Sequence, residues 1–170
     1  MGVSGCGKTT IGSALAAALG STFVDADALH PAGNLAKMAE GTPLTDEDRW
    51  PWLDAVGSAL SAGEVVVACS ALRWSYRERL CAAAPDVSFV HLHGPVELLR
   101  ERMSARRDHF MPTLLLDSQL ATLEPLLRSE RGTVVSLEPP IDEIVSTTLA
   151  FLRGNDGSTP LPQTPIGASR

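Results

Sequence analysis

The amino-acid sequence predicts an α/β fold in which a parallel β-sheet lies between layers of helices. Three observations predict it: a glycine-rich phosphate-binding pattern begins at residue 2, a helix and an acid-ended strand follow that pattern, and short apolar segments then alternate with helical ones. Ligands in such folds bind at the carboxyl ends of the strands. The polar residues that follow each expected strand are therefore the candidates for function.

The first element is a phosphate-binding loop. Residues 2–9, GVSGCGKT, match the pattern G-x-x-x-x-G-K-[ST], in which glycines let successive backbone N–H groups point at phosphate oxygens. Lys8 carries a positive charge to the outer phosphates, and Thr9 offers a hydroxyl to Mg²⁺. A glycine-rich helix cap is the alternative, and it leaves Lys8 unexplained in a chain with two lysines. The nucleotide-binding candidates are Gly2, Val3, Ser4, Gly5, Cys6, Gly7, Lys8, Thr9 and Thr10.

Helices and strands alternate after this loop. The segment TTIGSALAAALG predicts a helix, since Ile11, Leu15 and Leu19 recur every four residues and Gly20 follows. Strands are expected at 22–25, 64–69, 87–92 and 133–137, and further helices at 46–62, 73–83, 96–106, 114–127 and 140–152. The nearly continuous apolar run at 64–69 is typical of a strand buried on both faces of a sheet. The order loop, helix, strand is that of the P-loop NTPase three-layer fold.

Composition bounds the domain organisation and the partners. The 170 residues predict one domain, assigned to residues 1–153, and the Pro-, Gly-, Ser- and Thr-rich segment 154–170 is predicted to be a disordered tail. A net charge of −6 argues against a nucleic-acid surface, and no apolar run is long enough for a membrane span. The three cysteines lack metal-ligand spacing and predict reduced thiols in a cytoplasmic protein.

Two carboxylates, Asp25 and Asp27, follow the strand expected at 22–25. One could hold Mg²⁺ through a water molecule while the other accepts a proton from a substrate hydroxyl. A polar loop with a helix cap is the alternative interpretation, because Asp is common in both places. The P-loop nearby favours the functional interpretation.

Arginines and polar side chains gather around the next expected strand. Arg49 carries a planar fork that suits a carboxylate or a phosphate, although an exposed ion pair with Asp46 explains it equally well. The capping-box pattern of Thr45 and Asp48 explains those two residues structurally. Ser70 and Arg73 follow the strand at 64–69 and lie close to the apex of a loop.

A second set of candidates lies in the segment RERMSARRDHF. Arg102 and Arg106 are four residues apart and therefore share one helix face, where they could stabilise a transferring phosphoryl group from a lid at about residues 102–125. His30 and His109 adjoin Pro or Phe in polar loops and are ligand candidates. His91 and His93, on or just past a strand, are expected to be structural.

Together these motifs resemble the gluconokinase family of P-loop small-molecule kinases. The resemblance runs from Gly2 to about Phe151 and depends on the segments MGVSGCGKT, DADALHP, Asn34 with Lys37–Met38, GTPLTDEDRWPWL, CSALR…YR and HFMP-x-x-LL-x-SQ-x-x-x-LE. It implies ATP and Mg²⁺, transfer of the γ-phosphoryl group to the 6-hydroxyl of D-gluconate in gluconate catabolism, and often a homodimer.

The resemblance also implies roles for single residues. Residues 2–9 hold the ATP phosphates and Mg²⁺, Asp27 is the base or hydroxyl acceptor, and Asp25 contacts the metal through water, a split that depends on analogy with sister kinases. The implied gluconate site consists of Asp27, His30, Arg49, Ser70, Arg73 and His109. The implied catalytic group is Lys8, Asp27, Arg102 and Arg106.

Members of the family that this chain resembles carry an apolar strand before the P-loop, and here only Met1 precedes it. We therefore expect the first strand of the sheet to be missing from this chain. A start placed at an internal Met is the favoured explanation, because Met1 matches a residue that the family carries within that strand; true truncation is the alternative.

Two other functions stay open at this point. One is a kinase of the same fold that acts on shikimate or a nucleoside, against which the segments around His30 and His109 argue. The other is a nucleotide-binding regulatory module without catalytic activity. A panel of acceptor substrates tests the first alternative, and an upstream in-frame start that encodes a short apolar run would argue against the second.

Overall fold

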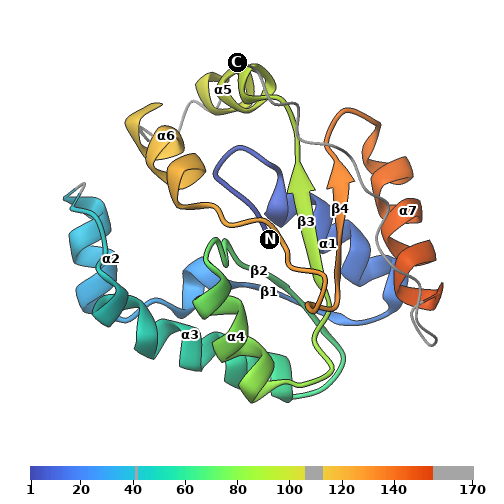
Figure 1. Cartoon of the computed structure of the whole chain (residues 1–170), viewed down its shortest axis with the longest axis horizontal. Helices are drawn as coiled ribbons and strands as arrows, with labels where there is room; N and C mark the ends of the chain where they lie inside the picture. The colour runs from blue at the N-terminus through green and yellow to red at the C-terminus, as the bar shows by residue number, and fades with distance from the viewer. Residues whose placement is uncertain (41, 106–112, 155–170) are drawn as a thin grey trace.

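The computed structural model describes residues 1–40, 42–105 and 113–154. Its elements are α1 (Lys8–Leu19), β1 (Thr22–Asp25), the short 3-10 helix η1 (Ala26–Leu29), α2 (Ala32–Ala39), α3 (Asp46–Ser61), β2 (Val65–Ala68), α4 (Trp74–Ala83), β3 (Phe89–His93), α5 (Val96–Ser104), α6 (Thr113–Thr122), β4 (Gly132–Ser136) and α7 (Ile141–Gly154). The alternation confirms the predicted α/β fold (Figure 1). Part of the expected lid and nearly all of the expected tail, residues 106–112 and 155–170, lie outside the described residues.

Both strand pairs are parallel, as the alternation of strands and helices predicts. β1 pairs with β2, with Thr22 opposite Val65, and β3 pairs with β4, with Phe89 opposite Gly132. α1 packs against β1, β2 and α7, whereas α3 packs against β2 and α4. The strands are therefore covered by helices, and their carboxyl ends are left to the loops that carry the candidate residues.

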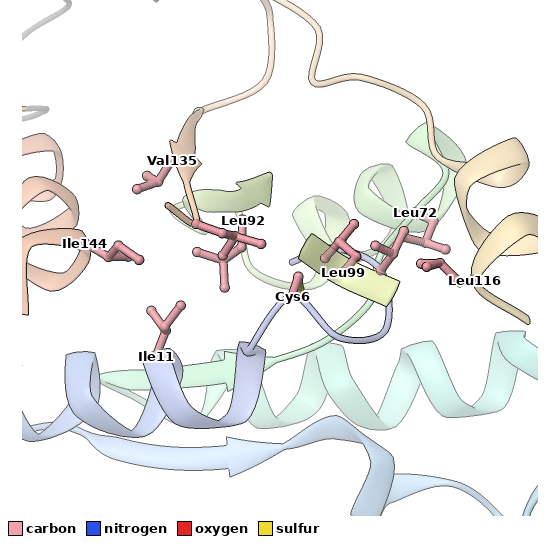
Figure 2. Close-up of a cluster of buried hydrophobic side chains, with 10 residues drawn as sticks. Cys6, Ile11, Leu72, Leu92, Leu99, Leu116, Val135 and Ile144 are labelled. Carbon is pink, nitrogen blue, oxygen red and sulfur yellow. The ribbon is translucent and has the colours of Figure 1, made fainter. Parts of the chain in front are cut away.

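Two apolar clusters form the core. One joins the P-loop and the start of α1 to β3, β4 and the helices that follow them, and Figure 2 shows Cys6 and Ile11 among Leu92, Leu99 and Ile144. The other lies between α3, α4 and the strands, around Trp52 and Leu53. Cys6 has no exposed surface, so the P-loop is packed into the core rather than laid over it. In the described part of the chain, no helix has the length and apolarity that crossing a membrane requires.

Met1 and Gly2 lie between the two strand pairs. The amino group of Met1 donates to the Val90 carbonyl (2.5 Å), the Met1 carbonyl accepts from Leu92 N–H (3.0 Å), and Gly2 N–H donates to the Ser70 carbonyl (3.2 Å). These two residues thus bond to β3 on one side and to the turn after β2 on the other, in the way that a short strand between them would. A cavity of about 780 Å³ continues from Met1 between β2 and β3.

This cavity corrects one expectation about β2. The run EVVVAC predicts a strand buried on both faces, but Val65, Val66 and Val67 are only half-buried and line the cavity, together with Phe89 and Val90. The residue types are right for a central strand. Burial is incomplete because the described residues place no strand beside this part of β2 on the cavity side.

The segment after β1, predicted as a polar loop, forms η1 and α2. α2 is only eight residues long, its one buried residue is the polar Asn34, and its Leu35 is exposed, so its burial does not follow its apolar residues. The helix expected at 114–127 ends earlier, at Thr122, because Pro125 cannot continue it. The predicted capping box of Thr45 and Asp48 is confirmed at the start of α3.

The cavity generates a prediction about stability. An extension of four β-branched apolar residues before Met1 would run about 13 Å into the cavity, parallel to β2 and β3. We expect it to raise the free energy of unfolding by at least about 3 kcal/mol, since each fully buried Val or Ile side chain contributes about 1.5–3 kcal/mol. Chemical denaturation measures the effect. An extension of the same length made of Gly and Ser is the control, and equal stability of the two variants would contradict the prediction.

The buried amino terminus generates a second prediction. Burial lowers the pKa of the Met1 amino group to about 6 from 8.0. The unfolded chain therefore binds more protons between these values, so stability rises as the pH rises from 6 to 8, by on the order of 2 kcal/mol. His91, whose pKa burial lowers to about 4 from 6.5, acts in a lower pH window. Acetylation of the amino terminus should flatten the profile between pH 6 and 8; an unchanged slope would assign it to another group.

Candidate active site

The P-loop curls tightly against α5 and ends at the start of α1. Gly5 and Gly7 adopt left-handed backbone conformations, with φ of 80° and 83°. A Cβ atom at Gly5 would lie 2.9 Å from the Leu99 carbonyl oxygen, so only glycine fits there. Gly7 provides no side-chain cap for α1, which leaves backbone N–H groups of its first turn available to an anion. The loop therefore has the form of a phosphate cradle.

Lys8 folds back over this loop. Its Nζ donates to the Val3 carbonyl (3.1 Å) and lies 4.0 Å from Cys6 Sγ. The ammonium group is thus held next to the N–H groups of the cradle. The neighbouring Ser4 N–H donates to Gln119 Oε1 of α6 at 2.6 Å, a contact that ties α6 to the loop. Sequence reasoning missed Gln119 as a contributor, although it lies in the SQ pair of the HFMP motif.

The two aspartates after β1 have different surroundings. Asp25 accepts hydrogen bonds from the Thr9 hydroxyl (Oδ2, 2.8 Å) and from Asp27 N–H (Oδ1, 3.1 Å). Asp27 lies on η1 and is exposed. Asp25 therefore faces the P-loop threonine, whereas the carboxylate of Asp27 is free to meet a ligand from solution. The side-chain cap by Asp25 exists as well, so the structural and functional interpretations of this residue are compatible.

Asp46 forms ion pairs with both arginines that are predicted to bind substrate, Arg49 and Arg73. Arg73 Nη1 donates to Asp46 Oδ2 (2.7 Å), and Arg49 Nη1 lies 3.5 Å from Asp46 Oδ1. The Tyr76 hydroxyl donates to the same carboxylate (2.5 Å), and both guanidinium groups lie 5.8 Å from the centre of its ring. Two guanidinium groups and one carboxylate leave a net positive charge in a half-buried setting. The cluster can therefore attract an anionic ligand.

Tyr76 is the member of this cluster that sequence reasoning missed. Its ring is buried at the start of α4 and its hydroxyl reaches the carboxylate. Burial, and then the bond to Asp46, raise the pKa of the Tyr76 hydroxyl, so it stays protonated and donates. The ion pair of Arg49 with Asp46, the alternative in the sequence analysis, is present. It does not exclude ligand binding, because Arg49 remains partly exposed.

His30 is held at the edge of the same region. Its ring stacks on Trp52 with centroids 4.4 Å apart and an angle of 11° between the planes. Its Nδ1 lies 3.3 Å from Nδ2 of the buried Asn34, which also donates to the Asp48 carbonyl (2.8 Å). Burial lowers the pKa of His30, so the ring favours its neutral form. A fixed, neutral imidazole can donate or accept a hydrogen bond from a hydroxyl-rich ligand.

The other predicted site residues lie in different parts of the chain. Ser70 lies in the turn after β2, and its carbonyl accepts from Gly2 N–H, which joins this turn to the P-loop. Because Asp25 is opposite Ala68 in the sheet, the carboxylates and this turn leave the strands at the same edge. Arg102 lies on α5 and donates to the Leu137 carbonyl (3.0 Å). Arg106 and His109 lie outside the described residues.

Comparison with known proteins places this site in a family context. The family model for shikimate kinase matches residues 4–137. A probable gluconokinase of Xenopus tropicalis is 45% identical over 166 residues, covering 86% of this chain and 87% of the relative. The crystal structure of a gluconokinase from Sinorhizobium meliloti 1021 matches with a TM-score of 0.84 and 51% identity, over 91% of this chain and 89% of that chain.

The fold is also similar to that of a solved structure with much lower sequence identity. Shikimate kinase from Aquifex aeolicus matches with a TM-score of 0.60 at 19% identity, over 92% of this chain and 95% of that chain. At this identity the likeness concerns the fold alone.

Proposed function

The chain belongs to the gluconokinase family, within the wider group that the shikimate kinase model describes, and we propose from this premise how its residues phosphorylate D-gluconate. The enzyme is a kinase that uses ATP as phosphoryl donor and forms 6-phosphogluconate. One observation carries the assignment of the acceptor site. A cluster with net positive charge, formed by Arg49, Arg73 and Asp46, includes an arginine of the turn after β2, and that turn accepts a hydrogen bond from the P-loop through the Ser70 carbonyl. Gluconate carries the carboxylate that such a cluster selects.

On the nucleotide side, residues 2–9 hold the ATP phosphates. The backbone N–H groups and the helix start supply donors, and Lys8 exchanges its contact with the Val3 carbonyl for a phosphate oxygen. The donor set fits Mg²⁺, since the Thr9 hydroxyl is an oxygen ligand and the Asp25 carboxylate, 2.8 Å from it, can hold a metal-bound water molecule. When bound there, Mg²⁺ neutralises developing charge on the phosphates. Asp25 orients the Thr9 hydroxyl toward it.

On the acceptor side, the guanidinium groups of Arg49 and Arg73 bind the carboxylate of gluconate. Asp27, exposed on η1, accepts the proton of the attacking hydroxyl. His30 and Ser70 bind the hydroxyls of the sugar chain. The catalytic roles of Arg102 and Arg106 in a lid at about 102–125, and the role of His109 in the gluconate site, remain predictions. The division into a kinase domain of residues 1–153 and a disordered tail of residues 154–170 is a prediction as well.

Release of ADP in the presence of D-gluconate, shikimate or adenosine tests the proposed acceptor. We expect turnover with gluconate to exceed turnover with the other two acceptors by orders of magnitude, because neither alternative presents the same carboxylate and hydroxyl chain. Preference for shikimate or adenosine would establish the kinase of the same fold instead. Nucleotide binding without turnover of any acceptor would favour the regulatory module.

Replacing Lys8 tests the cradle. Lys8→Ala removes the charge closest to the transferring group, so kcat/KM should fall by at least about 100-fold while the thermal unfolding temperature changes little. Lys37→Ala is the matched control, since Lys37 is the other lysine of the chain and pairs with Asp48 (2.6 Å). Turnover retained by Lys8→Ala at the wild-type level would remove Lys8 from the catalytic group.

Replacing the arginines tests the acceptor site. Arg49→Ala and Arg73→Ala should each raise KM for gluconate by about tenfold or more and leave KM for ATP within a factor of two, since a charge-assisted hydrogen bond contributes about 1.5–3 kcal/mol. Arg79→Ala, on the same helix as Tyr76 but paired with Asp54, is the control. A rise in KM for ATP alone would move these arginines to the nucleotide side.

A further inference from the structure

Arg77 is the largest fully buried side chain of the described residues, and the proposed chemistry does not use it. It lies on α4 and pairs with Glu130, through Nε to Oε1 (2.5 Å) and Nη2 to Oε2 (3.0 Å). The side chains are 0% and 7% exposed. An ion pair this deep needs an explanation, because desolvation of both charges can exceed their attraction.

The other hydrogen bonds of Arg77 connect two chain segments. Nη1 donates to the carbonyls of Ala71 and Leu72, each at 3.2 Å, in the turn after β2. It also donates to the Glu124 carbonyl (3.2 Å), and Nη2 donates to the Pro125 carbonyl (3.1 Å), in the segment after α6. Every nitrogen of the guanidinium group is therefore engaged, and the planar fork is used in full.

A second pair of bonds joins the same two segments. Glu124 N–H donates to the Leu72 carbonyl (2.8 Å), and Glu124 Oε2 accepts from Trp74 N–H (2.5 Å). The turn after β2 is thus held by two sets of hydrogen bonds, one from the Arg77 side chain and one with Glu124 of the segment after α6. Both sets of bonds lie outside the cluster of Asp46.

The turn held in this way contains a residue with an unfavourable backbone conformation. Ala71 has φ of 43°, the single positive φ among non-glycine residues of the described chain. An L residue other than Gly, Asn or Asp adopts this region reluctantly, because its Cβ approaches the backbone. Ser70 directly precedes Ala71 and Arg73 lies two residues after it, and both are among the residues proposed to bind gluconate. Strained residues of this kind persist where the surroundings determine them and often lie at functional sites.

We propose that Arg77, oriented by Glu130, is a positioning residue that holds the turn at 70–73 in the shape that presents Ser70 and Arg73 to gluconate. This inference rests on the proposed function of that turn. Arg77 does not touch the substrate. It acts through its hydrogen bonds to the carbonyls of Ala71 and Leu72. The buried ion pair with Glu130 holds the guanidinium group in one orientation.

The test replaces both charges at once, so that neither is left buried and unpaired. Arg77→Met with Glu130→Met keeps the volume and should keep the fold. KM for gluconate should rise by about tenfold, because a small displacement of a binding group weakens its contact, while KM for ATP stays within a factor of two. Amide hydrogen exchange at residues 70–74 should accelerate. Arg77→Lys, which keeps the charge but not the fork, should show a smaller rise.

Arg79→Met with Asp54→Met is the matched control, because Arg79 lies on the same helix as Arg77 and pairs with Asp54 of α3 instead of the turn. An unchanged KM for gluconate in a folded Arg77→Met/Glu130→Met variant would overturn the proposal, and so would an equal rise in both KM values. Arg73→Ala separates the two levels of inference. If it raises KM for gluconate and the double variant does not, the positioning role alone fails; if Arg73→Ala has no effect, the proposed acceptor site fails.

Discussion

The placement of the P-loop between two pairs of parallel strands is the constraint on which the site depends. Met1 pairs with β3 and Gly2 bonds to the turn after β2, so the first two residues determine where the cradle begins. The start of α1 determines where it ends, and the buried Cys6 fixes the middle against the core. A cradle of backbone N–H groups acts through preorganisation, because groups that are already aimed need not reorganise during phosphoryl transfer.

In the proposed acceptor site, two positive charges must be held close together. Arginines that await an anionic substrate repel each other in its absence, and Asp46 together with the Tyr76 hydroxyl offsets that repulsion. One carboxylate between two guanidinium groups leaves charge for the substrate while it keeps the arginines in place. Tyr76 adds rigidity, since its buried ring supports both side chains from α4.

The two halves of the site are mechanically connected. Ser70 accepts from Gly2, and Gln119 of α6 accepts from Ser4, so the turn that follows β2 and the helix that follows the undescribed segment both touch the P-loop. Arg77 and Glu124 then join that turn to the chain after α6. A displacement at any of these points would reach the others through short, directional bonds. Such connections are suited to a reaction in which donor and acceptor must align.

The local features of this protein could be predicted from its residues alone: the P-loop, the four strands within two residues of their ends, the capping box of α3 and the polar residues after each strand. Each of these depends on residue types at short spacings. The contacts that assemble the site emerge from the folded chain: Asp46 joins Arg49 to Arg73, Gln119 reaches Ser4 across 115 residues of sequence, and Arg77 holds the strained Ala71. α2 was not predicted for a related reason, because this short helix is held by its buried polar Asn34, which bonds to α3. Partners that packing brings together leave no periodic pattern in the chain, so their pairing cannot be inferred from spacing.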